Sequence, residues 1–145
     1  MQLWRLYREA HGPGLDGIGG LHAAGRWHEL GTRVVYFGAT AGIVVLEKLA
    51  HIDPVVLPAD LILARFEGDV SVEDVLTGEA DDITDIVQTR ARGEKFFREQ
   101  KACVLRARSV ILPEEYNCAL NPLHPEAVNI KPVEFRHFSF DGRLL

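Results

Sequence analysis

The stretch GRWHELGTRVVYFGATAGIVVLEKLAH, residues 25–51, decides how the chain folds. Its central part, residues 32–39, alternates side chains between two faces and predicts a β-strand that carries Tyr36. Thr40 follows and has a hydroxyl suited to cap a helix, which the sequence predicts over residues 41–51. A strand and a capped helix therefore follow one another directly, and they bring polar side chains close to buried structure.

Outward from this stretch, alternating apolar and polar residues predict further strands. These expected strands cover residues 3–9, 61–66, 102–107 and 133–140. A helix is predicted over residues 84–100, with Ile86, Val87, Phe96 and Phe97 facing inward. Strands and helices do not alternate regularly, and this mixture indicates an α+β fold.

Two other segments are predicted to be irregular. Residues 67–85 are acidic with few large apolar side chains, so we expect an exposed connection, with room for a short helix. Residues 109–125 predict a loop-rich end with a short buried piece. We find no internal repeat, and we expect one domain over residues 1–145.

The composition is that of a soluble globular protein. The chain has 145 residues, of which 47% are hydrophobic and 26% are charged, and this length can bury a substantial core. No apolar run approaches the roughly 20 residues that cross a bilayer, and the first residues do not resemble a signal peptide. We therefore predict a cytoplasmic protein with no membrane contact.

The charge argues against direct binding of nucleic acid. The formal net charge is −5, whereas phosphate binding needs a concentrated basic surface. The clearest basic cluster comprises Arg90, Arg92 and Lys95, and we interpret it as one solvated helix face.

Two further classes of site are excluded by spacing. Gly12, Gly14 and Gly17 match the dinucleotide pattern GxGxxG, but no helix pattern follows them, so we predict a plain glycine-rich loop. The six histidines are dispersed, and Cys103 and Cys118 form no CxxC pair. We therefore expect reduced, buried thiols and no metal site.

Three residues of the opening stretch are candidates for a site. Arg26 has a fork suited to a pyrophosphate, or it is a surface side chain whose stem covers Trp27. Tyr36 is a core tyrosine or a residue that meets a ligand. Glu47 lies at the edge of an apolar helical arc, which suits a solvated carboxylate or one that faces a cleft.

The joint pattern of several short motifs resembles the RES-domain family. These motifs are Gly25-Arg26-Trp27, Gly31, Val34-Val35-Tyr36, Leu46-Glu47 with His51, Ser109, Asn121-Pro122, His124-Pro125 and the ending Phe140-Asp141-Gly142-Arg143-Leu144. The resemblance begins at Leu3-Trp4-Arg5 and covers nearly the whole chain. It implies a single domain with a mixed, mainly antiparallel β core flanked by helices, similar to ADP-ribosyltransferases.

The resemblance also implies an activity. RES domains are toxins of RES-Xre toxin-antitoxin pairs and include NAD phosphorylases. This chain would cleave the nicotinamide-ribose bond of NAD, by phosphorolysis to ADP-ribose 1″-phosphate or by hydrolysis. NAD is then a substrate, inorganic phosphate an optional co-substrate, and no prosthetic group is expected. The implied partner is an Xre-type helix-turn-helix antitoxin, with which the chain would form an oligomeric complex.

The candidate residues suit this chemistry. Arg26 would pair with the pyrophosphate, and Tyr36 would offer a flat face or a hydroxyl to the nicotinamide-ribose end. Glu47 would hydrogen-bond a ribose hydroxyl and stabilise the developing oxocarbenium ion. Ser109 and Asn121 are neutral hydrogen-bonding candidates, or they are turn residues.

Other interpretations remain open at this level. The same site could transfer ADP-ribose to a protein target, which makes the chain a mono-ADP-ribosyltransferase. In a different class, the chain is a catalytically weak module that binds the antitoxin. His51 either adjusts the Glu47 carboxylate or pairs with it on the surface.

Overall fold

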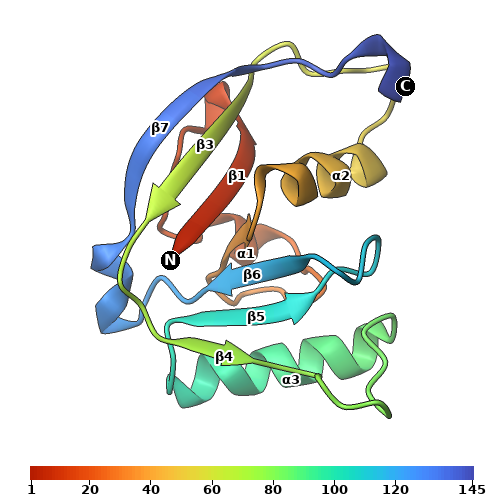
Figure 1. Ribbon diagram of the computed structural model, residues 1–145. Helices are drawn as coiled ribbons and strands as arrows, with labels where there is room; N and C mark the ends of the chain where they lie inside the picture. The colour runs from red at the N-terminus through yellow and green to blue at the C-terminus, as the bar shows by residue number, and fades with distance from the viewer.

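One seven-stranded sheet runs through the protein, as the computed structural model of residues 1–145 shows (Figure 1). Its strands are β1 (Gln2–Arg8), β2 (Val35–Gly38), β3 (Leu61–Glu67), β4 (Val72–Asp74), β5 (Val104–Arg108), β6 (Tyr116–Leu120) and β7 (Lys131–Phe138). Their order across the sheet is β4-β5-β6-β2-β1-β3-β7. Only the pairing of β4 with β5 is parallel, so the predicted mixed, mainly antiparallel α+β fold is confirmed.

Three α-helices and three short 3-10 helices complete the fold. The α-helices are α1 (Gly19–His22), α2 (Ala41–His51) and α3 (Ile86–Glu99), and the 3-10 helices are η1 (Glu9–His11), η2 (Pro125–Asn129) and η3 (Gly142–Leu144). Figure 1 shows α2 beside β1, and α3 beside β4 and β5. Helix α2 also contacts β2. No helix is long and apolar enough to cross a membrane.

The core consists of two buried clusters. One joins strands β1, β2, β3, β5 and β6 and contains Leu3, Phe37 and Phe66, with Phe37 and Phe66 packed edge to face. The other joins α3 to the sheet through Phe96, Phe97 and residues of β5 and β6. The second cluster fixes the position of α3, which in turn holds one wall of the site described below.

The two long helices begin and end close to their predicted limits. Helix α2 spans the predicted residues, and the Thr40 hydroxyl accepts a hydrogen bond of 3.2 Å from the backbone N–H of Ile43. Helix α3 begins after Asp85, whose carboxylate accepts a hydrogen bond of 3.0 Å from the Val87 N–H. Phe96 and Phe97 are buried as expected, but Val87 is 74% exposed because it lies in the first turn, beyond the core.

The structure corrects the two segments that were predicted to be irregular. The acidic segment contains strand β4 instead of a helix, and bidentate pairing of Arg106 with Asp74 (2.6 and 2.9 Å) ties this strand to β5. The loop-rich end contains β6, a fully paired central strand. Both strands are short and lack clear alternation, so pairing with their neighbours decides their structure.

Both cysteines are buried free thiols, as predicted. Burial raises the pKa of Cys103 to about 11 and the pKa of Cys118 to about 12. Neither side chain is therefore a thiolate at neutral pH.

Candidate functional site

A cleft of about 650 Å³ lies beside α2, and its walls include residues 24–27, Tyr36 and Phe37 in the middle of β2, and the loop after β5. This volume falls within the range of roughly 300 to 1,000 Å³ that is typical of small-molecule sites. Arg26, Tyr36 and Glu47 all line it, although they come from three different elements. The three candidates of the opening stretch therefore converge on one cavity.

The carboxylate of Glu47 is held by two hydrogen bonds to the same oxygen. Its Oε1 accepts from Ser109 Oγ at 2.8 Å and from Asn117 Nδ2 at 2.7 Å. Neither bond engages Oε2. The side chain is thus oriented from one side, and its second oxygen is available to a hydroxyl group in the cleft.

Ser109 is fully buried and acts from behind the cleft. Its Oγ accepts hydrogen bonds from the backbone N–H groups of Ile111 (3.1 Å) and Leu112 (3.3 Å), and it donates to Glu47. The same hydroxyl therefore shapes the loop after β5 and orients the carboxylate.

Asn121 does not line the cleft, in contrast to its predicted role. Its side chain is 3% exposed, and Oδ1 accepts a hydrogen bond of 3.0 Å from the Leu123 N–H in a turn. The amide that reaches the cleft belongs to Asn117 on β6. Sequence reasoning missed Asn117 because the strand that carries it was not predicted.

Tyr36 presents its ring to the cleft while its hydroxyl is engaged elsewhere. The hydroxyl lies 2.6 Å from Nδ1 of His28 and accepts a hydrogen bond of 3.2 Å from the Trp27 N–H. Burial raises the pKa of Tyr36 above its usual value, so the phenol stays neutral. His51 also lines the cleft, but its Nδ1 donates to the backbone carbonyl of Glu47 (2.8 Å) and not to the carboxylate.

Helix α3 holds the segment that carries Arg26. Nε of Arg90 donates to the Gly25 carbonyl (2.7 Å), and an added Cβ at Gly93 would lie 1.7 Å from the carbonyl oxygen of Trp27. Arg26 Nη1 donates to the Ile83 carbonyl at 3.0 Å, in the connection that precedes α3. The guanidinium is therefore braced from one side, and its other N–H groups remain for a ligand.

The cleft is strongly cationic although the whole chain is acidic. The charged lining residues are five cations, Arg5, Arg26, Lys48, Arg90 and Arg108, and one carboxylate, Glu47. Such a concentration of one sign in a concave site favours an anionic ligand.

The placement of Arg90 corrects the predicted solvated helix face. Arg90 lines the cleft, Arg92 pairs with Glu73 at 2.6 Å, and only Lys95 is largely exposed. Arg5 on β1 also lines the cleft and packs over the rings of Tyr7 and Phe37, and burial lowers its pKa. No local pattern in the sequence marks these cations as neighbours.

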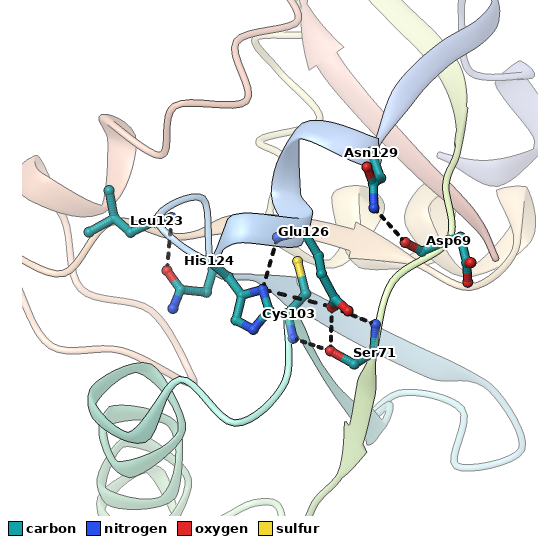
Figure 2. Close-up of polar contacts among 8 residues, drawn as sticks. Asp69, Ser71, Cys103, Leu123, His124, Glu126 and Asn129 are labelled. Carbon is teal, nitrogen blue, oxygen red and sulfur yellow. Dashed lines mark hydrogen bonds and ion pairs between the residues drawn. The ribbon is translucent and has the colours of Figure 1, made fainter.

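Figure 2 shows a second polar cluster, none of whose labelled residues lines the cleft. Potential metal-ligand atoms of Cys103, His124 and Glu126 lie within 4.8 Å of one another. However, the Glu126 carboxylate accepts from the N–H (2.9 Å) and hydroxyl of Ser71, and His124 Nδ1 accepts from the Glu126 N–H (3.1 Å). These hydrogen bonds explain why the polar side chains lie together. They connect the segment after β6 to Ser71, which directly precedes β4.

The chain resembles known proteins over nearly the whole length of both partners in each comparison. The Toxin Res of Pseudomonas putida (strain KT2440) is 34% identical over 148 residues and covers 99% of both chains. The Prs ADP-ribosylating toxin of Sphingobium sp. (strain YBL2) is 29% identical over 157 residues, which is 98% of this chain and 95% of the relative.

A solved structure is similar in fold. A chain in the crystal structure of the M. tuberculosis MbcT-MbcA toxin-antitoxin complex superposes with a TM-score of 0.76 at 14% identity, over 95% of this chain and 84% of that one. The family model described as RES domain matches residues 2–141. With nearly its whole length matched, the chain belongs to the RES domain family.

Proposed function

We propose that this protein is the toxin of a type II toxin-antitoxin pair and that it degrades NAD by cleaving the bond between nicotinamide and ribose. The observation that carries this proposal is the Glu47 carboxylate, fixed at Oε1 by Ser109 and Asn117, in an otherwise cationic cleft. A dinucleotide with two phosphates and ribose hydroxyls matches this distribution of charge.

The reaction needs little acid catalysis. The bond from the ribose C1″ to the nicotinamide nitrogen breaks, its electron pair leaves with neutral nicotinamide, and positive charge develops on the sugar. Oε2 of Glu47 would accept a hydrogen bond from a ribose hydroxyl and stabilise that charge, and this interaction strengthens in the transition state. Attack by phosphate gives ADP-ribose 1″-phosphate, and attack by water gives ADP-ribose.

The remaining contacts are assigned to binding. Arg26 would form the bidentate contact to the pyrophosphate, because its guanidinium is already braced by Ile83. Arg90 would add positive charge on the same wall, since it holds the neighbouring Gly25 carbonyl. No prosthetic group is part of this proposal.

The proposed partner is an Xre-type helix-turn-helix antitoxin, in an oligomeric complex in the cytoplasm. A toxin-antitoxin complex is the source of the similar structure, which supports an antitoxin partner. The net charge of −5 agrees with DNA binding by that partner and not by this chain.

The test is NAD consumption by the purified chain, with and without inorganic phosphate. Glu47→Gln should lower turnover by about 10² to 10³-fold, whereas Glu114→Gln, on the exposed part of the same loop as Ser109, should leave it unchanged. Loss of NAD only with phosphate identifies a phosphorylase, and loss without phosphate identifies a glycohydrolase. Folded protein that consumes no NAD in either buffer contradicts the proposal.

A second candidate is a mono-ADP-ribosyltransferase with a protein target. The name of the Sphingobium relative, an ADP-ribosylating toxin, favours it. It uses the same cleft, and it predicts transfer of labelled ADP-ribose to a protein in a cell extract, abolished by Glu47→Gln. A catalytically weak antitoxin-binding module would show neither activity.

A further inference from the structure

A buried histidine lies directly behind the tyrosine of the cleft. His28 is 3% exposed, and its two ring nitrogens lie 2.6 Å from the Tyr36 hydroxyl and 2.7 Å from the Ala23 carbonyl oxygen. Its ring is tilted by 46° to that of Tyr36, with 5.5 Å between the centroids. His28 therefore contacts the tyrosine through its polar end and not by stacking.

The direction of these hydrogen bonds follows from the chemistry of the partners. A carbonyl oxygen only accepts, so Nε2 of His28 carries the proton that points to Ala23. In the neutral ring Nδ1 is then an acceptor, and the Tyr36 hydroxyl must donate to it. The same hydroxyl oxygen accepts from the Trp27 N–H at 3.2 Å, so its proton and one lone pair are both used.

The backbone of the turn encloses this hydroxyl. A Cβ on Gly25 would lie 2.7 to 2.8 Å from ring atoms of His28 and 2.8 Å from the Tyr36 hydroxyl. The Gly25 N–H donates to the His28 carbonyl at 3.1 Å, which closes the turn around Arg26. The tyrosine hydroxyl is thus part of the structure that presents Arg26.

We propose that His28 is a positioning residue whose Nδ1 accepts the hydrogen bond donated by the Tyr36 hydroxyl, so that the ring face of Tyr36, and not its hydroxyl, meets the substrate. The role of the hydroxyl is to fix the turn of residues 25–28 to β2. This inference rests on the proposed function, because the cleft must act on a ligand with a flat group for the ring face to matter.

Two substitutions of His28 separate its two hydrogen bonds. Asparagine places an amide near the position of Nδ1, so His28→Asn keeps an acceptor for Tyr36. Glutamine reaches the position of Nε2, so His28→Gln keeps the contact with Ala23 and loses the one with Tyr36. Tyr36→Phe removes the same bond from the other side, together with the acceptor of the Trp27 N–H, and keeps the ring.

The expected NAD turnover of each variant depends on whether it keeps the hydrogen bond between Tyr36 and His28. NAD turnover of His28→Asn should stay within about fivefold of the parent, whereas His28→Gln and Tyr36→Phe should fall by about tenfold each. The double variant His28→Gln/Tyr36→Phe should be no worse than Tyr36→Phe alone, because Tyr36→Phe already lacks the bond that His28→Gln removes. If Tyr36→Phe loses far more than His28→Gln and the two losses multiply, the hydroxyl acts on the substrate and the inference is wrong.

A measurement on the parent protein needs no activity and separates this inference from the proposed function. Long-range ¹H–¹⁵N spectra near pH 8, where imidazoles are generally neutral, should show His28 protonated at Nε2 and bare at Nδ1. A proton on Nδ1 would overturn the inference even if NAD is consumed. If NAD is not consumed but the Nε2 tautomer is found, the proposed function fails while the geometry of the pair stands.

Discussion

Ser109 donates a hydrogen bond of 2.8 Å to the carboxylate of Glu47 although 62 residues separate the two in the chain. Asn117, 70 residues from Glu47, donates to the same oxygen at 2.7 Å. The loop after β5 and strand β6 thus meet helix α2 at one carboxylate oxygen. This convergence defines the orientation of the only acid in the cleft.

Loss of either donor should slow the reaction more than it weakens binding. Ser109→Ala and Asn117→Ala should each lower kcat by about tenfold with little change in KM, because Glu47 acts mainly in the transition state. Asn117→Asp should be worse than Asn117→Ala, since it places a second carboxylate beside the first. Steady-state kinetics with NAD measure these effects, and exposed Ser139→Ala is the control. Equal effects on kcat of Asn117→Ala and Ser139→Ala would contradict the role of Asn117.

The guanidinium of Arg26 should not be replaceable by an ammonium. In Arg26→Lys a single nitrogen cannot hold the Ile83 carbonyl and a pyrophosphate together, so KM for NAD should rise by about tenfold. Arg143→Lys is the matched control, because Arg143 is exposed and pairs only with Asp141. An unchanged KM in Arg26→Lys would show that Arg26 does not bind the substrate.

A methyl group at Gly93 should destabilise the fold. Its Cβ would lie 1.7 Å from the Trp27 carbonyl oxygen, so α3 must move away from the turn that carries Arg26. We expect Gly93→Ala to lower the free energy of unfolding by about 1 to 3 kcal/mol, as measured by urea denaturation. Gly19→Ala lies in α1 with no atom within 4 Å of its Cβ and should be neutral or slightly stabilising. Equal stability of the two variants would argue against this packing.

The two cysteines should not react in the folded protein. Cys103 and Cys118 are 0% and 1% exposed, and their pKa values of about 11 and about 12 leave almost no thiolate near neutral pH. A chromogenic thiol reagent should label neither in native buffer and both in urea. Rapid labelling of one thiol in native buffer would show that the structure that buries this thiol opens locally.

Acid should weaken the link between η2 and β4. The hydrogen bonds from the Ser71 side chain, and then from its backbone, hold the pKa of Glu126 below its usual value of 4.5. The stability that this carboxylate contributes is fully present above that value and is lost as the pH falls through the lower pKa of the folded state. Thermal unfolding of Glu126→Gln should therefore change less with pH in this acidic range than that of the parent. An identical pH dependence would exclude a contribution from Glu126.

The sequence predicted the elements whose signals are local. Helix α2 follows from the Thr40 cap and an apolar arc, and the fold class follows from the mixture of short strands. Strands β4 and β6 were missed because neither has a clear periodicity, and pairing with β5 holds both in the sheet. The lining of the cleft was predicted in part for the same reason: Arg26, Tyr36 and Glu47 share one stretch of sequence, whereas Asn117 lies on a strand that only the sheet stabilises.

By itself the sequence determined the capped helix, the class of fold and the small set of polar groups that lie close to buried structure. Only the tertiary structure decided that Asn117 and not Asn121 reaches Glu47, that Arg90 lines the cleft and that the Tyr36 hydroxyl lies against Nδ1 of His28. The physical reason is that periodicity and capping act over a few neighbouring residues. The direction of a hydrogen bond in the site depends instead on groups brought together by sheet pairing and helix packing across the chain.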